Sequence, residues 1–168
     1  IQTSGARFAL GAGTADAIYQ NLNLIRETRP DLVCIFGGDH IYFMDITQMM
    51  REHVANQADV TIAAIPVELS EASRFGVIGA GRDGRIDAFH EKVANPPTMP
   101  GDPNRCYGSM GNYVFSREIL DAMLEEDAKD ASSSHDFGKD ILPRMVAGGQ
   151  RVFAYDFERN AIPGRPEG

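Results

Sequence analysis

Apolar and polar positions follow two different rhythms in the first part of the chain. Over 13–29 and again over 45–57 the apolar side chains recur at helical spacing, and Pro30 ends the first of these segments. The stretches 32–36 and 59–67 are instead short apolar runs that contain Val and Ile, as expected of strands covered on both faces. The order helix, strand, helix, strand predicts an α/β fold with a mostly parallel sheet flanked by helices.

The later part of the chain predicts shorter strands and one long loop. Residues 75–80 and 85–90 should pair as a hairpin, because the intervening segment 81–84 begins and ends with glycine. Four prolines within 94–104 predict a loop there. The remaining pattern predicts a strand over 109–115, helices over 118–126 and 137–146, and a last strand over 152–157.

Composition and charge narrow the class of protein. The 168 residues are 43% hydrophobic, which is ordinary for one globular domain, and the formal net charge of −8 opposes bulk electrostatic binding of nucleic acid or anionic lipid. No apolar run approaches the roughly 18 residues of a membrane span. Cys34 and Cys106 lack metal-ligand spacing, and the apolar run around Cys34 predicts a buried thiol. We expect a cytoplasmic protein with neither nucleic acid nor membrane as a partner.

The stretch VCIFGGDHIY carries the first candidate site. In open parallel sheets, ligands bind beyond the carboxyl ends of the strands, where glycines let the backbone approach phosphate groups. Gly37 and Gly38 occupy that place after a predicted strand, and Asp39 follows them. Since a carboxylate beside phosphates requires a hard cation between them, Asp39 is a candidate Mg²⁺ ligand. A role for Asp39 in capping a turn is equally compatible with the spacing.

Three further stretches are chemically suggestive but weak alone. Gly13 opens a predicted helix whose amides could face a nucleotide, although GAGTAD lacks a phosphate-binding lysine and an ordinary helix start is the alternative. Glu91 and Lys92 follow a strand and suit sugar hydroxyls and a phosphate, or else form a solvated charge pair. The consecutive residues 134–136, Ser-His-Asp, cannot align as a catalytic triad, and a helix cap is the better interpretation.

Taken together and in order, six stretches closely resemble one enzyme family, the bacterial ADP-glucose pyrophosphorylases, also called glucose-1-phosphate adenylyltransferases. The stretches are GTADAIYQNL, GGDHIY, EASRFGVI, FHEKVANPP, SMGNYVF and SSSHDFGKDILP. The resemblance runs from about Gly13 to Gly168. It implies a Rossmann-like nucleotidyltransferase fold and synthesis of ADP-glucose and pyrophosphate from ATP and glucose 1-phosphate, the committed step of bacterial glycogen synthesis. It also implies an allosteric homotetramer.

The resemblance assigns roles residue by residue. Asp39 matches the catalytic aspartate that holds Mg²⁺, and Lys92 matches the lysine that binds the phosphate of glucose 1-phosphate. Glu91 matches a glutamate on the sugar. Ser109 and Gly111 match residues lining the glucose pocket, and Gly13 lies where the family backbone approaches the nucleotide.

The chain also departs from the family pattern. Segment 1–10 has no match that we can place, and Val93 replaces the proline that usually follows the Glu-Lys pair. The family's glycine- and arginine-rich signature, the second metal aspartate and the left-handed β-helix domain are expected outside the 168 residues. We therefore expect 1–168 to be a partial catalytic domain, incomplete at both ends and inactive or nearly so by itself.

Three alternatives remain open at this stage. One is a nucleotidyltransferase that uses UTP or dTTP with the same sugar phosphate. Another is a non-catalytic regulatory subunit of the same fold, against which the presence of both Asp39 and Lys92 speaks. The third is a general α/β nucleotide-binding module, which the EK and SMG motifs disfavour.

Overall fold

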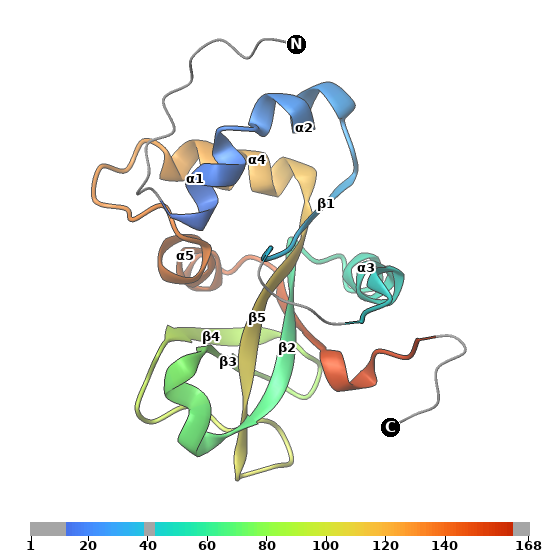
Figure 1. The fold of residues 1–168 in the computed structure, drawn as a ribbon, viewed down its shortest axis with the longest axis vertical. Helices are drawn as coiled ribbons and strands as arrows, with labels where there is room; N and C mark the ends of the chain where they lie inside the picture. The colour runs from blue at the N-terminus through green and yellow to red at the C-terminus, as the bar shows by residue number, and fades with distance from the viewer. Residues whose placement is uncertain (1–12, 39–42, 163–168) are drawn as a thin grey trace.

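The computed structural model describes residues 13–38 and 43–162, so the candidate metal ligand Asp39 lies outside the described residues. Its elements are shown in Figure 1. The helices are α1 (Thr14–Tyr19), α2 (Leu22–Thr28), α3 (Ile46–Ala55), α4 (Arg117–Asp127) and α5 (Leu142–Ala147), with 3-10 helices at Leu69–Arg74 and Phe157–Arg159. The strands are β1 (Leu32–Ile35), β2 (Val60–Glu68), β3 (Gly76–Ala80), β4 (Ile86–Glu91), β5 (Arg105–Ser116) and β6 (Val152–Asp156).

The described strands form one mixed sheet, so the α/β class is confirmed and the expectation of a mostly parallel sheet is wrong. The order is β4-β3-β5-β2-β6, with β1 also paired to β5. Only β2 and β6 pair in parallel among the described strands. Both β1 and β2 pair with Tyr113 and Phe115 of β5, so β5 lies antiparallel between them. The sequence rhythm placed β1 and β2 in the same direction, but it did not reveal the later strand inserted between them.

Most predicted elements are confirmed within a few residues, with two differences in the helices. The segment 13–29 forms two helices, α1 and α2, because the chain leaves helical geometry at Asn21, with φ −108° and ψ 11°. The predicted helix 137–146 begins as a π-helical turn, Phe137–Ile141, before α5. The predicted hairpin is the antiparallel pair β3 and β4.

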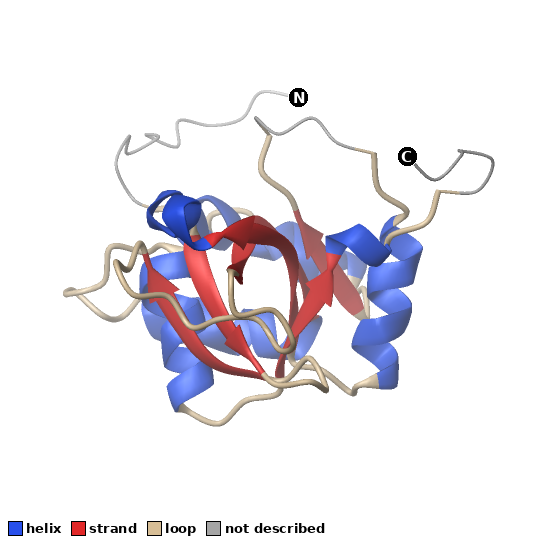
Figure 2. Ribbon diagram, turned by 90° about the horizontal axis from the view of Figure 1, so that it is seen from below, coloured by secondary structure: helices blue, strands red, loops and turns tan. Residues whose placement is uncertain are grey.

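Helices cover both faces of the curved sheet, as Figure 2 shows. On one face, Met49 of α3 packs against Ala63, Val114 and Tyr155. On the other face, α4 and α5 contribute to the larger core, which includes Leu120, Leu124, Leu142 and Met145 together with Phe115 and Phe137. This larger core supports the floor of the candidate site.

The edge position of β1 corrects one prediction. Cys34 is exposed, not buried, because among the described strands β1 pairs along one edge only, with β5. Cys106 is fully buried. Within the described ranges, no helix is long and apolar enough to cross a membrane.

Candidate active site

A cavity of about 1040 Å³ lies where β2, β4 and β5 meet the start of the segment that leads into α5. Its volume is at the upper end of the range for small-molecule sites. The polar residues of its inner wall are Thr14, Glu91, Ser109, Tyr113 and Asp136, with Gly37, Gly111 and Gly138 among the glycines. These residues come from five separate stretches of sequence, and the fold brings them to one place.

The structure brings three of the predicted site residues into the cavity wall: Glu91, Ser109 and Gly111. Lys92 lies beside that wall, with its ammonium 3.8 Å from Glu91 Oε1 and its side chain 61% exposed. Such an exposed cation remains available to a bound anion. The resemblance to the family is therefore consistent with the position of the Glu91–Lys92 pair.

β5 has a bulge between Ser109 and Tyr113, two residues that both line the cavity. Ile62 of β2 pairs with Tyr113, but Ala64 pairs with Ser109, so β5 carries extra residues between the two pairs. Gly111 lies within the bulge at φ +71°, a conformation that favours glycine. The Ser109 hydroxyl accepts a hydrogen bond from the Gly111 amide at 3.3 Å, which orients Ser109 in the wall.

Tyr113 is a site residue that motif matching missed. Its side chain is nearly buried, and burial raises the pKa of Tyr113 to about 12, with the negative charges of Asp136 and Glu91 acting in the same direction. The phenol is therefore neutral at physiological pH and is able to donate a hydrogen bond. The alternation of SMGNY puts positions 109, 111 and 113 on one strand face, and this signal could have identified it.

Asp136 is the second site residue that motif matching missed. Its contacts also show that Ser134, His135 and Asp136 have separate structural roles. Asp136 Oδ1 accepts hydrogen bonds from the amides of Gly138 at 2.9 Å and Lys139 at 3.1 Å, which confirms the predicted helix cap. The three consecutive side chains bond to different partners, since Ser134 donates to Asp140 and His135 bonds to Asp127. The prediction from sequence that these three residues form no catalytic triad agrees with these contacts.

Gly13 does not line the cavity, although the neighbouring Thr14 does. A Cβ at position 13 would lie 2.6 Å from the carbonyl oxygen of Ser134 and closer still to that of His135. The Gly13 amide donates to Ser134 O at 3.0 Å. This contact gives Gly13 a structural role, close packing against the segment before α5, that the sequence did not suggest.

The charges around the cavity favour a ligand rich in hydroxyl groups. Glu91 and Asp136 contribute carboxylate acceptors to the inner wall. The two guanidinium groups of the lining are already paired, Arg74 with Glu71 at 3.0 Å and Arg105 with Asp102 at 2.7 Å. Acceptors of this kind bind the hydroxyls of a sugar, and Lys92 at the edge suits an attached phosphate.

A sequence profile of the nucleotidyl transferase family matches residues 1–161. The chain belongs to this family, and its α/β fold agrees with that assignment.

Among its relatives, a glucose-1-phosphate adenylyltransferase of Thermus thermophilus is 52% identical over 153 residues, which are 91% of this chain and 37% of the relative. A protein of Vibrio parahaemolyticus named glucose-1-phosphate adenylyltransferase 1 is 53% identical over 155 residues, covering 92% of this chain and 38% of the relative. A glucose-1-phosphate adenylyltransferase of Anaeromyxobacter dehalogenans is 50% identical over 156 residues. The chain thus spans less than two fifths of the length of these relatives.

Proposed function

We propose that the protein containing this chain is a glucose-1-phosphate adenylyltransferase, which makes ADP-glucose and pyrophosphate from ATP and glucose 1-phosphate. The observation that carries the proposal is the convergence of Glu91, Ser109, Tyr113 and Asp136 on one cavity with Lys92 beside it. Relatives that are 50–52% identical to the chain over the aligned residues bear this name.

In this proposal the chain binds and orients the sugar phosphate. Glu91 and Asp136 accept hydrogen bonds from sugar hydroxyls, while the neutral Tyr113 phenol and the Ser109 hydroxyl donate or accept as the ring requires. Lys92 binds the phosphate through its exposed ammonium. Position 111 faces open space, because a Cβ there would meet no atom within 4 Å in the part of the chain that the structure describes. Gly13 would approach the nucleotide through its backbone.

The reaction is an in-line displacement. A phosphate oxygen of glucose 1-phosphate forms a bond to the α-phosphorus of ATP, and the bond from that phosphorus to the pyrophosphate leaving group breaks. The protein accelerates such a reaction mainly by holding the two anions in line and by offsetting their charge. The proposal requires no covalent intermediate with the enzyme.

We further propose Mg²⁺ as the cofactor and Asp39 as its ligand. Within the described residues, no group of three or more His, Cys, Asp or Glu could hold a metal ion. Mg²⁺ is commonly bound by one or two carboxylates together with phosphate oxygens, so a single aspartate fits this chemistry once a nucleotide is present. The ion, when bound, neutralises negative charge on the phosphates. We also propose cytoplasmic localisation, a role in glycogen synthesis and a homotetrameric assembly.

The proposal is tested by pyrophosphate release from glucose 1-phosphate and Mg²⁺ with ATP, UTP or dTTP, on protein made from the complete coding sequence. We expect turnover with ATP to exceed turnover with the other two nucleotides. Asp39→Asn should lower kcat by at least about a hundredfold, the range seen when a single group that stabilises transition-state charge is removed. Preference for UTP or dTTP would support the alternative transferase. Undiminished activity of Asp39→Asn would remove Asp39 from the mechanism, and no activity with any nucleotide would favour a regulatory subunit.

A further inference from the structure

A buried carboxylate outside the cavity holds together three segments of the fold. Asp127, the last residue of α4, is 2% exposed. Its two oxygens contact Ser133 Oγ at 2.7 Å, His135 Nδ1 at 2.7 Å and Arg144 Nη2 at 3.3 Å. A buried carboxylate with such partners is strongly held, and removal of one cationic partner leaves its charge less completely compensated.

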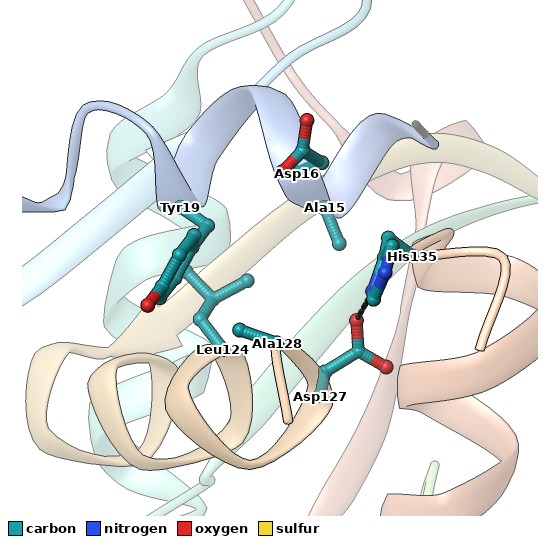
Figure 3. Close-up of a pocket in the computed structure, with 7 residues that line it drawn as sticks. All are labelled: Ala15, Asp16, Tyr19, Leu124, Asp127, Ala128 and His135. Atoms are coloured by element: carbon teal, nitrogen blue, oxygen red, sulfur yellow. Dashed lines mark hydrogen bonds and ion pairs between the residues drawn. The ribbon is translucent and has the colours of Figure 1, made fainter. Parts of the chain in front are cut away.

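Figure 3 shows where this pair lies. His135 and Asp127 line a small pocket of about 110 Å³ between α1 and α4, together with Ala15 and Asp16. The pocket is too small for a sugar or a nucleotide, whose sites are several times larger. Asp127 and His135 do not line the large cavity either. We therefore look for a structural role of this pair.

The backbone of the segment 133–137 connects this pair with the cavity wall. His135 adopts φ +55°, which is uncommon for a residue other than glycine. Its carbonyl accepts a hydrogen bond from the Ala15 amide at 2.9 Å, and the carbonyl of Ser134 accepts one from Gly13 at 3.0 Å. The start of α1 is thus fixed to the backbone of the segment 133–137, and the side chain of His135 in this segment bonds to Asp127.

The next residues along each chain segment belong to the cavity. Thr14 Oγ1 donates to Asp136 Oδ2 at 3.1 Å and accepts from the Phe137 amide at 3.2 Å. Thr14 and Asp136 both line the cavity. The position of these two groups consequently depends on the segment 133–137.

We propose that Asp127 and His135 are positioning residues for the sugar cavity: they hold the segment 133–137 so that Asp136 and Thr14 present their polar groups to the sugar phosphate. This inference rests on the proposed function for the identity of the ligand. The ion pair acts through Asp136 and Thr14 and touches no substrate itself.

The electrostatics of the pair agree with this role. The hydrogen bond to Asp127 raises the pKa of His135, and Asp127, Asp16 and Asp140 contribute charge in the same direction. The guanidinium of Arg144 approaches Asp127 from the α5 side. A charged pair at 2.7 Å has the geometry of a strong, directional hydrogen bond, which suits a fixed support.

The experiment uses Asp127→Asn and His135→Asn, singly and together, in protein made from the complete coding sequence. Asn keeps the size of Asp, and at position 135 it tolerates a positive φ. We expect each single variant to raise the KM and Kd for glucose 1-phosphate about tenfold, the worth of one charge-assisted hydrogen bond, with the KM for ATP changed less than about twofold. The Kd of the double variant for glucose 1-phosphate should not exceed the higher Kd of the two single variants, because both substitutions remove the same interaction.

Hydrogen exchange supplies a readout that needs no ligand. In the two single variants the amides of Gly13 and Ala15 should exchange at least about tenfold faster, while amides of β2 keep their rates. Glu126→Gln is the matched control, since Glu126 lies on the same turn of α4 and is 3.7 Å from Arg144 but touches none of 133–137. It should change neither sugar affinity nor exchange.

Three outcomes would overturn the inference, and a fourth would overturn the proposed function instead. Unchanged exchange at Gly13 and Ala15 overturns it, and so does faster exchange without any loss of sugar affinity. Equal losses of affinity for sugar and nucleotide would show a general structural defect and would also overturn it. If the unmodified protein binds no glucose 1-phosphate, the proposed function fails, and the exchange rates alone then decide whether the pair holds the segment.

Discussion

The hydroxyl of Thr14 and the carboxylate of Asp136, 122 positions apart in sequence, are joined by a 3.1 Å hydrogen bond at the wall of the cavity. The same hydroxyl accepts from the amide of Phe137. One threonine therefore fixes both a site carboxylate and the start of the helical segment that follows it.

Replacement of Thr14 by valine should destabilise the protein and weaken sugar binding together. Valine keeps the shape but leaves Asp136 and the Phe137 amide without this partner, at a cost of about 1–2 kcal/mol in the free energy of unfolding. Thr14→Ser retains the hydroxyl and should stay within about 0.5 kcal/mol of the natural protein. Urea unfolding measures the stability, and titration of glucose 1-phosphate measures the affinity. Equal stability and affinity of Thr14→Val and Thr14→Ser would contradict the role assigned to the Thr14 hydroxyl.

Gly13→Ala should be more harmful than an ordinary glycine substitution in a loop. The added Cβ would collide with the backbone carbonyls of Ser134 and His135, and backbone cannot turn aside as a flexible side chain does. We expect a loss of about 1–3 kcal/mol in the free energy of unfolding, typical of overpacking. Gly38→Ala is the comparison, because a Cβ there meets no atom of the described residues within 4 Å. Equal stability of the two variants in urea would disprove the close approach at Gly13.

His53 makes the stability sensitive to acid. This 1% exposed imidazole bonds through Nδ1 to Thr61 Oγ1 at 2.9 Å and through Nε2 to Ser116 Oγ at 3.1 Å. Since Ser116 donates its own proton to Ala58 O, it accepts from Nε2–H, and Nδ1 accepts from Thr61. Burial lowers the pKa of His53 below its ordinary 6.5. The charged form is therefore disfavoured in the folded protein.

The sign of the pH effect follows from that depressed pKa. The contribution of neutral His53 is complete above pH 6.5, the ordinary pKa, and is lost as the pH falls below it. Urea unfolding between pH 8 and 5 should show this loss in the natural protein and a flatter dependence in His53→Gln. His90→Gln, at an exposed position, should retain the natural dependence. Equal pH dependences of the natural protein and His53→Gln would contradict the buried neutral imidazole, because His135, whose pKa is raised, contributes with the opposite sign in both proteins.

Asp59 and Arg151 join the starts of β2 and β6, the one parallel pair among the described strands. Asp59 Oδ2 accepts from the Arg151 amide at 2.7 Å, and Oδ1 accepts from its guanidinium at 2.9 Å. Burial opposes ionisation, but the bonds to Arg151 outweigh it and lower the pKa of Asp59 below 3.8. Its stabilising contribution is thus present above pH 3.8 and lost as the pH falls further.

Asp59→Ala should cost about 2 kcal/mol at neutral pH, because two hydrogen bonds to a largely buried carboxylate are removed. Thermal or urea unfolding measures the loss. Glu118→Ala, which removes an 83% exposed carboxylate paired with Arg117, should cost less than about 0.5 kcal/mol. Similar losses in the two variants would show that the Asp59 contacts add nothing beyond a surface ion pair.

The sequence predicted local elements well and long-range pairing poorly. Periodicity located α3, α4 and β2 because each is decided by residues close in the chain. The insertion of β5 between β1 and β2 depends on contacts between distant segments, which periodicity does not contain. For the same reason, the motifs indicated Glu91 and Ser109, whereas Asp136 became a site residue only once the fold placed it beside Thr14. The role of Asp39, which lies outside the described residues, remains a prediction from sequence.

The central claim is that the cavity beside Lys92 binds glucose 1-phosphate. Calorimetric titration of this sugar phosphate into protein from the complete coding sequence tests it most directly, with Glu91→Gln and Lys92→Gln as variants. We predict saturable binding to the natural protein, with a Kd at least about tenfold higher in each variant, since each loses a charge-assisted contact. Absence of binding, or equal affinity in all three proteins, would contradict the account.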